Sequence, residues 1–590
     1  MNGQWETFAA NGDQTYNFNL GQSQGTNRMI TTYLTYKWET DFNNLTLMVG
    51  NEVKKNNSSW VNASAKDYLS ANIRQTALAN DQDSKKGSGA LNMDDRMISY
   101  YGRLVYSLKD RYILTATFRK DGSSNFSEKN KWGTFPSAAL AWRVKEESFL
   151  QDVDWLDNAK VRFSWGQTGN LGGLGGKSTA ALSLTSYYFY GNGRVMGVNS
   201  DHTNRAQGLY APLIDRALKW ETNEQTDFGV DLAFLNSELS VSLDYYVRNT
   251  KDLLVYRTMR SSSGWTDVYT NFGEIQNKGF EFSVNYNKQL TKDWAINVTF
   301  NGSTLKNEVT KMELPIFRDA TGGNDGSTLD GSNVQAVDGG SKWDNHSLTK
   351  QGSSIGSYYG WRVEKIYKDQ AEIDEDNATA KKNTDGSVNY RQQPETTVGD
   401  YKFKDLNGDG IIDNEDREII GDGIPAFTFG LNIGATYKNW DFTLYTNGIL
   451  GQDLLSYSAM RLSTTRISDD NTAANILKES WDDIKAGKLP RATFQDYNYN
   501  CRVSDAWVKN GNFLRISNLQ IGYTVPKKLI RPYGVESIRA YTAISNLALF
   551  SPYKKYGDPE CGQGDVMFTG LDTGRYPTPR TYMFGLNVTF

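Results

Sequence analysis

Cysteine, histidine and proline are scarce in this chain of 590 residues. It has two cysteines, Cys501 and Cys561, two histidines, His202 and His346, and 12 prolines. Two cysteines exclude a zinc-finger array and a disulfide-dense secreted scaffold. A histidine-based metal or catalytic centre would have to use one of the two histidines. Both fall in polar loop sequence, so we expect each to be a solvated loop residue.

Long apolar runs and an excess of charge of one sign are also absent. No stretch of about 18 apolar residues occurs, which excludes a transmembrane helix. The 64 Lys and Arg balance 68 Asp and Glu, so the overall charge does not indicate binding to nucleic acid or to an anionic membrane. Apolar residues make up only 38%, which is low for a packed soluble protein, whereas aromatics reach 13%. What remains is a chain of many β-strands, without the need for a dry core.

Strict alternation of apolar and polar residues is the main pattern in the sequence. In 226–235, for example, Phe228, Val230, Leu232 and Phe234 alternate with polar or small residues. Strands of the same type are predicted at 28–39, 44–54, 96–108, 111–121, 134–144, 159–167, 226–235, 238–247, 279–287, 294–301, 425–437, 440–449, 511–523, 537–549 and 580–590. Weaker candidates at 13–20, 355–366 and 399–404 bring the total to roughly eighteen strands.

Short and long connections alternate along the chain between these strands. Turns of a few residues alternate with long polar loops such as 305–354, 450–510 and 550–579. Short turns at one end, large loops at the other and dyad-repeat strands are typical of an outer-membrane antiparallel β-barrel. Its apolar rows would face lipid and its polar rows a hydrated lumen, which explains the low apolar fraction. A tandem of soluble β-sandwiches or a propeller remains the alternative, although no repeat of fixed length is visible.

The C-terminal strand favours the barrel and orients it. Tyr582, Phe584, Leu586 and Val588 alternate up to the terminal Phe590, like the strand by which outer-membrane barrels are recognised for insertion. If Phe590 lies on the periplasmic side, every short turn is periplasmic and every long loop is extracellular. Cys501 and Cys561 then share the extracellular side. A disulfide between them and two separate thiols both remain open.

Seven segments together resemble the SusC/RagA-type TonB-dependent transporters of Bacteroidetes outer membranes. They are FRKDGSSNFSEKNKWGTFPSAALAWRV (118–144), VRFSWGQTGN (161–170), LKWETNEQTDFGVDLAFLNSELSVSLDYYVRNTKDLL (218–254), FGEIQNKGFEFSVN (272–285), GDYKFKDLNGDGIIDNEDREIIGDGIPAFTFGLN (399–432), GNFLRISNLQIGYTVP (511–526) and YPTPRTYMFGLNVTF (576–590). The resemblance implies a barrel of 22 strands closed by an N-terminal plug that couples to TonB. No plug, TonB box or signal sequence is visible here. We therefore expect residues 1–590 to be the C-terminal part of such a transporter, as a fragment or as one piece of a split protein.

The segment 399–424 contains a motif like a calcium-binding loop. Its ligand positions would be Asp405, Asn407, Asp409, the carbonyl of Ile411, Asp413 and Asp416, with Gly410 at the sharp turn. The carboxylates repel one another unless a cation neutralises them, so we expect a structural Ca²⁺. The alternative is an Asx-rich surface turn that hydrogen-bonds its own amides.

The functional prediction is an importer and not an enzyme, since no catalytic constellation emerges. The resemblance implies a bacterial outer-membrane transporter that receives oligosaccharides or peptides from a SusD-like surface lipoprotein, driven by TonB through a plug outside this chain. Loop aromatics would contact cargo, at Tyr188, Trp265, Trp343, Tyr358, Tyr359 and Trp361. A siderophore-type receptor, a passive porin and a secreted carbohydrate-binding all-β protein are the alternatives. The sequence does not name the cargo.

Overall fold

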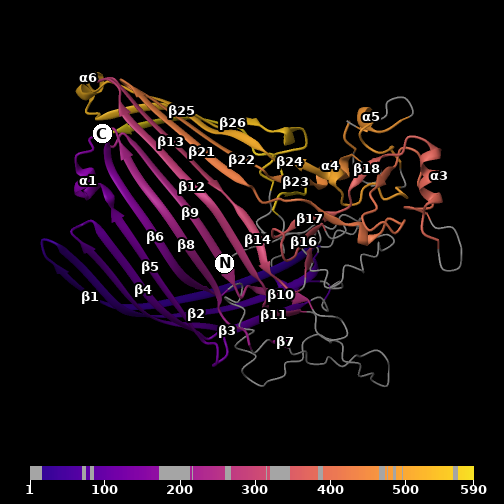
Figure 1. Ribbon diagram of the computed structural model, residues 1–590, viewed down its shortest axis with the longest axis horizontal. Coiled ribbons are helices and arrows are strands. Elements are labelled where there is room, and N and C mark those ends of the chain that lie inside the picture. The colour runs from indigo at the N-terminus through magenta and orange to yellow at the C-terminus, as the bar shows by residue number, and fades with distance from the viewer. Residues whose placement is uncertain are drawn as a thin grey trace.

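The computed structural model is dominated by one large curved antiparallel sheet (Figure 1). It describes residues 16–590 except 69–74, 80, 82–84, 172–212, 215–216, 259–266, 314, 319–345, 383–389, 464–471, 475, 483–486, 494–495 and 562–568. The fifteen strands along the sheet are β1 (Tyr16–Glu39), β2 (Asn43–Tyr68), β3 (Lys86–Leu108), β4 (Tyr112–Ser123), β5 (Trp132–Arg143), β6 (Leu156–Asn170), β8 (Glu221–Phe234), β9 (Leu239–Lys251), β12 (Glu274–Gln289), β13 (Trp294–Thr304), β21 (Phe427–Tyr437), β22 (Trp440–Leu450), β25 (Phe513–Thr524), β26 (Ser537–Phe550) and β28 (Thr581–Thr589). A sixteenth, β14 (Lys306–Lys311), pairs with β12.

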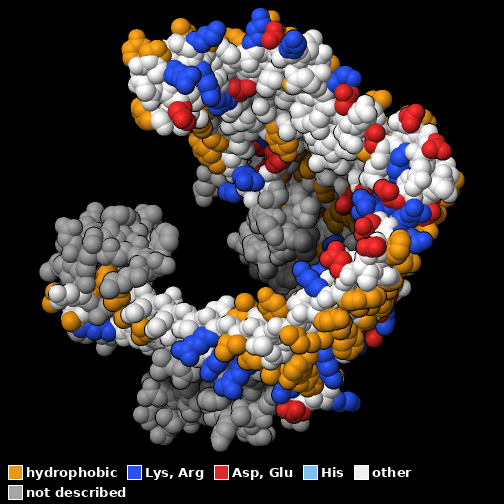
Figure 2. All heavy atoms as spheres, turned by 90° about the vertical axis from the view of Figure 1, so that its left-hand side faces the viewer, with side chains coloured by type: hydrophobic (Ala, Val, Ile, Leu, Met, Phe, Trp, Pro, Cys, Tyr) orange, Lys and Arg blue, Asp and Glu red, His pale blue; other side chains and the backbone are white. Residues whose placement is uncertain are grey.

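Each strand of this sheet pairs with the next one along the path, whether a short turn or a long loop joins the two. Among the described residues, β1 and β28 each pair on one side only, so the sheet is an open arc of barrel wall and not a closed ring. Figure 2 shows this arc around a central space. The fifteen stronger sequence predictions are all confirmed as strands of the arc. Of the weak candidate 13–20, residues 16–20 merge into β1, and 355–366 and 399–404 lie outside the arc, which explains the smaller strand number.

The alternation places apolar rows on one face of the arc and polar rows on the other. Phe228, Tyr245 and Phe280 are direct cross-strand neighbours, and their side chains are 40–50% exposed on the lipid-facing side. Aromatic pairs such as Trp294–Tyr437 and Trp440–Tyr523, with ring centroids 4.6 and 4.8 Å apart, lie beside the short turns. Rings of this kind form the girdle at a membrane interface. Among the described residues, no helix is long and apolar enough to cross a membrane.

The long loops carry smaller elements at the extracellular end (Figure 1, right). Small sheets are formed by β7 (Leu213–Ile214), β10 (Leu254–Thr258) and β11 (Asp267–Asn271); by β15 (Ile316–Arg318), β16 (Ser347–Thr349), β17 (Ser357–Gly360) and β20 (Glu418–Gly421); by β18 (Val363–Ile366) and β19 (Tyr401–Phe403); and by β23 (Asp453–Ser456), β24 (Val508–Asn510) and β27 (Leu571–Asp572). The described helices of four or more residues in the long loops are α3 (Gln370–Ala378), α4 (Tyr457–Leu462), α5 (Ile476–Glu479) and the 3₁₀ segment η8 (Pro552–Lys555), whereas α1 (Ser148–Gln151) and α6 (Lys527–Ile530) lie at the opposite end (Figure 1, left). Shorter 3₁₀ segments are η1 (Thr76–Leu78), η2 (Val144–Glu146), η5 (Asn414–Asp416), η6 (Asp505–Trp507) and η7 (Arg531–Tyr533).

The described parts of three of these loops, 346–424, 451–512 and 551–580, fold together into one body, which we call the surface unit. Its apolar core consists of Tyr358, Trp361, Tyr401, Phe403, Ile412, Ile420, Leu455, Tyr457, Met460, Val503, Trp507 and Leu571. The Tyr358 hydroxyl donates to the carbonyls of Asp453 (3.2 Å) and Thr569 (2.8 Å), which joins all three loops. The extracellular end of the arc therefore carries a folded platform with its own core.

Candidate functional site: a hollow in the lumen wall

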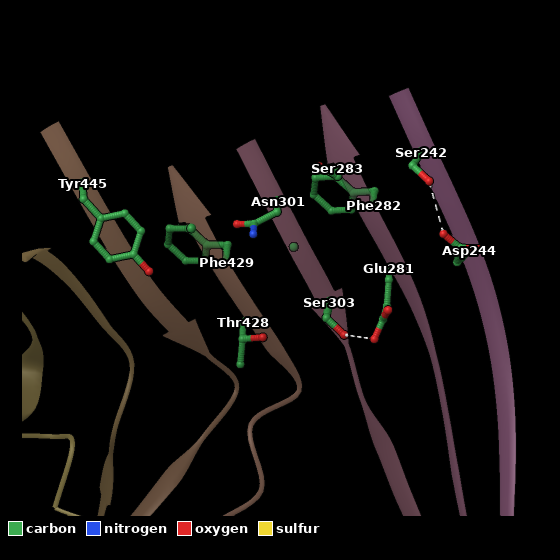
Figure 3. Close-up of a pocket in the computed structure, with 12 residues that line it drawn as sticks. Ser242, Asp244, Glu281, Phe282, Ser283, Asn301, Ser303, Thr428, Phe429 and Tyr445 are labelled. Carbon is green, nitrogen blue, oxygen red and sulfur yellow. Dashed lines mark hydrogen bonds between the residues drawn. The ribbon is translucent and has the colours of Figure 1, made fainter. Parts of the chain in front are cut away.

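The inner face of the arc contains a hollow of about 470 Å³ between β9 and β22. Its lining residues are Ser242, Asp244, Glu281, Phe282, Ser283, Asn301, Gly302, Ser303, Thr428, Phe429, Gly430 and Tyr445 (Figure 3). Most of them belong to the polar positions of five neighbouring strands. The hollow is therefore part of the lumen-facing surface that the alternation predicted.

Short side chains in one cross-strand row create this hollow. Ser242, Ser283, Asn301 and Gly430 follow one another across β9, β12, β13 and β21. Gly430 has no side chain to fill the space, and a Cβ at this position would lie 2.6 Å from Oδ1 of Asn301. Because this row is small, the larger side chains of the rows above and below it form the rim.

The rim combines carboxylates, hydroxyls and one aromatic ring. Asp244 is paired with Arg162, whose Nη2 lies 2.8 Å from Oδ1. For Glu281, in contrast, the described residues include no ion pair. Its carboxylate accepts a hydrogen bond from the Ser303 hydroxyl at 3.4 Å. The ring of Tyr445 is 45% exposed among polar side chains on the lumen side. Acidic, hydroxyl and aromatic groups around one hollow can hydrogen-bond and stack a polar solute.

The sequence pattern does not predict this hollow. The signal was present as short residues at polar positions of adjacent strands, such as Ser242, Ser283 and Gly430. Their alignment in one row depends on the register between strands, however, and alternation within a strand does not specify register.

The loop aromatics predicted to contact cargo have a different role where the structure describes them. Tyr358 and Trp361 are 1% and 5% exposed and lie in the core of the surface unit, so their rings offer no face to a solute. The prediction is wrong for these two. Tyr359 is half-buried against Arg417, whose guanidinium lies 4.4 Å from the ring centre. Tyr188, Trp265 and Trp343 lie outside the described residues.

Trp361 stacks between two arginines from different loops. The guanidinium of Arg417 lies 4.7 Å and that of Arg502 5.0 Å from the indole. Its Nε1 donates to the Asp413 carbonyl at 2.8 Å, and its amide donates to the Val503 carbonyl at 3.0 Å. Cation–π contacts of this kind gain strength when they are desolvated. Trp361 is therefore a structural link between the loops 346–424 and 451–512.

The loop 405–416 is held by its own amides and by two cations of the chain. The carboxylate of Asp405 accepts from the amides of Gly408 and Gly410 and lies 3.0 Å from Nη2 of Arg391. Asp409 lies 3.3 Å from Nζ of Lys381. These contacts are typical of an Asx-rich turn, which is the alternative to calcium binding that the sequence allows.

The last residue of this loop is buried and closes it. The Asp416 carboxylate accepts from the amides of Leu406 and Asp413, both at 2.8 Å. Burial raises its pKa. No group of three or more His, Cys, Asp or Glu side chains in the described parts of the chain is arranged to hold a metal ion. The calcium site therefore stays a prediction.

Comparison with known proteins identifies the family of the chain. The family model described as "TonB dependent receptor-like, beta-barrel" matches residues 2–449. The chain belongs to this family. It is therefore an outer-membrane protein, as the sequence predicted.

The relatives of this receptor-like barrel include one protein named SusC. The chain is 31% identical to TonB-dependent receptor P3 of Formosa agariphila, over 96% of this chain and 52% of the relative. It is 29% identical to TonB-dependent receptor SusC of Bacteroides thetaiotaomicron, over 98% of this chain and 51% of the relative. The chain thus spans about half the length of these relatives. A solved structure, "Structure of the RagAB peptide transporter", superimposes with a TM-score of 0.75 at 19% identity and covers 98% of this chain and 57% of that one, which supports the fold.

The cysteines of the receptor-like barrel do not form a disulfide in the structure, so the disulfide alternative is wrong here. Cys561 is 4% exposed among Leu454, Tyr553 and Tyr556. Burial, with the nearby Asp572 carboxylate, raises the pKa of its thiol to about 12, which makes it unreactive at neutral pH. Cys501 packs against the core of the surface unit.

The prediction of a solvated histidine is wrong for His346. Its side chain is fully buried in the surface unit, edge-on to Tyr457 with ring centres 5.9 Å apart. Burial, together with the charge of Arg417, lowers its pKa to about 3, so the imidazole is neutral at physiological pH. His202 lies outside the described residues.

Proposed function

We propose that the protein forms part of an outer-membrane importer of the SusC type. It would move oligosaccharides or peptides from a SusD-like surface lipoprotein to the periplasm, with energy from TonB. The observation that carries this proposal is an arc of barrel wall with a polar lumen face in a chain whose relatives are TonB-dependent receptors. Its role is transport and not catalysis. We favour the SusC type over a siderophore receptor or passive porin because a SusC-named relative aligns with 98% of the chain.

We propose that cargo touches the barrel wall at the hollow during passage. The hollow offers Glu281, Asn301 and the exposed ring of Tyr445 to a solute in the lumen. Such groups hydrogen-bond hydroxyls or amides and stack on flat apolar faces. Both oligosaccharides and peptides present these features.

Uptake by cells with and without the protein tests the proposed function. Fluorescent oligosaccharides and peptides should enter only cells that express it, and a surface lipoprotein should co-purify with it in neutral detergent. A Ser283→Phe variant, which fills the hollow, should lower uptake several-fold. The control is Val284→Phe at the next position, which projects to the lipid side and should leave uptake unchanged.

These outcomes separate transport by this barrel from other routes. Equal uptake without the protein would contradict import. Equal uptake by the Ser283→Phe and Val284→Phe variants, with both proteins inserted in the membrane, would exclude the hollow as a cargo contact.

We also propose that Ca²⁺ orders the loop 405–416. The proposal rests on the identity and spacing of Asp405, Asn407, Asp409, Asp413 and Asp416, which supply the oxygen ligands that Ca²⁺ prefers. In the structure Arg391 and Lys381 neutralise two of these carboxylates, and a bound ion would take over that role.

Calorimetric titration of the purified protein with Ca²⁺ measures this directly. We expect a dissociation constant of about 10⁻⁴–10⁻³ M, the range of extracellular calcium modules. Asp409→Asn should weaken binding at least tenfold, because it removes a charge but keeps the acceptor for the Ile411 amide. Asp374→Asn on the exposed side of α3 is the matched control. No binding heat at millimolar Ca²⁺ would leave the Asx-rich turn as the whole explanation.

A further inference from the structure

The turn 525–536 between β25 and β26 of the receptor-like barrel carries a cluster of cations. It contains α6 and η7 and places Lys527, Lys528 and Arg531 within five residues, all three exposed. Gly534 closes it with a left-handed φ of 72° and donates its amide to the Arg531 carbonyl. The basic turn is thus a structured element, so little conformational entropy opposes binding. The near-neutral charge of the whole chain conceals this local cluster.

No carboxylate of the described residues neutralises these three cations by an ion pair. Several other cations at the same end of the arc do have partners within the chain. Arg111 pairs with Glu147 at 3.3 Å, and Lys288 pairs with Glu238 at 2.8 Å. Lys145 donates to three backbone carbonyls that end the α1 segment. The positive charge of the basic turn is therefore available to an external anion.

The position of the basic turn places it at the level of lipid headgroups. Tyr523 lies three residues before Pro526, the N-cap of α6, and packs on Trp440 with ring centres 4.8 Å apart. Aromatic pairs of this type lie at the boundary between hydrocarbon and headgroups. The lysines follow a few residues beyond it, where lipid phosphates are found.

The basic turn also carries apolar side chains between and next to its cations. Leu529 is 63% and Tyr533 82% exposed, whereas Ile530 is buried and fixes α6 to the barrel. On the adjacent β28, the lipid-facing Phe584 and Leu586 are 83% and 65% exposed. Both the turn and the neighbouring lipid-facing strand therefore expose apolar side chains. Basic and apolar groups together match an amphipathic lipid better than a free ion.

We propose that the basic turn binds an anionic phospholipid of the periplasmic leaflet, with Lys527, Lys528 and Arg531 at its phosphate and Leu529 and Tyr533 at its glycerol and acyl region. Cations near an anionic lipid surface each raise affinity by a factor of about five. The bound lipid would anchor this side of the arc beside the terminal strand, to which Glu536 connects through its amide and the Thr589 carbonyl.

Native mass spectrometry of the full chain in neutral detergent, titrated with phosphatidylglycerol or phosphatidylcholine, tests this inference. The protein should retain phosphatidylglycerol preferentially. The triple variant Lys527→Gln, Lys528→Gln, Arg531→Gln should bind it about a hundredfold more weakly. The matched control replaces Lys109, Lys292 and Lys438, one from each of three other short turns, with glutamine. It changes the net charge equally and should retain the lipid.

Each other outcome overturns the proposal. Equal loss in the control variant would mean general electrostatics and not a site at this turn. Full displacement of the lipid by millimolar inorganic phosphate would identify a simple anion site. Equal retention of phosphatidylcholine would exclude recognition of anionic lipid. Unchanged heat-modifiable mobility on gels verifies that both triple variants are folded.

Discussion

Replacing Trp361 with alanine is expected to unfold the surface unit, whereas the barrel arc stays folded. The side chain is 5% exposed, stacks between Arg417 and Arg502 and donates a hydrogen bond to Asp413. Removing a buried Trp costs about 3–5 kcal/mol through lost contacts and the cavity left behind. Here it also leaves two guanidiniums without the ring that covers them. This loss of free energy is comparable with the whole free energy of unfolding of a small folded unit.

Hydrogen exchange resolved by peptide measures this effect. Amides in 346–424 and 451–512 should lose protection in Trp361→Ala, whereas β4, β8 and β12 keep theirs. Tyr576→Ala is the control, because Tyr576 is also an aromatic of an extracellular loop but is 86% exposed. Protection that is unchanged in Trp361→Ala would mean that the loops do not depend on this contact.

Replacing Arg515 with methionine is expected to detach the loop 551–580 from the barrel wall. Arg515 projects from β25 and forms ion pairs with Asp558 and, at 2.6 Å, with Glu560. The side chains of Arg515 and Asp558 are only 6% and 9% exposed, so the variant leaves a buried carboxylate without its cation. Breaking a buried pair in this way costs about 3–5 kcal/mol. Limited proteolysis should then cut the loop 551–580 much faster.

The effect of Arg515→Met should depend on pH in a defined direction. Burial by itself would raise the pKa of Asp558, but the Glu560 amide and Arg515 outweigh it, so the pKa lies below its ordinary value. A lowered pKa in the folded state gives stability that is complete above about pH 4 and is lost as pH falls through the folded pKa. In Arg515→Met, burial without the cation raises the pKa of Asp558 instead, so the proteolysis difference between the two proteins should be largest near neutral pH and shrink as the pH falls.

An exposed pair provides the control for this prediction. Lys306 and Glu308 lie 3.3 Å apart, with side chains 66% and 37% exposed. Lys306→Gln should leave the proteolysis rate unchanged, because solvent screens such pairs. A rate equal to wild type in Arg515→Met as well would show that the loop is held by its other contacts.

Local pattern alone specified the strands and their two faces. A residue such as Phe228 or Ser242 faces lipid or lumen because its neighbours in the same strand alternate with a period of two. That period is a property of any extended backbone. The short turns followed for the same reason. At the β3–β4 connection Lys109 and Asp110 adopt the left-handed φ values of 53° and 52° that tight hairpins require.

The roles of side chains in the long loops depended on tertiary contacts. The local sequence around Tyr358, Trp361 and His346 does not distinguish them from exposed loop residues. They are buried because loops more than 90 residues apart along the chain pack together, as the bond from Tyr358 to Asp453 shows. A loop has no periodicity that records which face is covered. Its burial is therefore decided by partners distant in sequence.

The sequence by itself therefore determined the barrel wall, its polar lumen and the family, because these depend on short-range alternation and on motifs along the strands. Only the tertiary structure decided where the wall is hollow, which loop aromatics are core and which cations remain without a carboxylate. Each of these depends on register and packing between distant segments. Their free energies arise from contacts that a local sequence pattern does not encode.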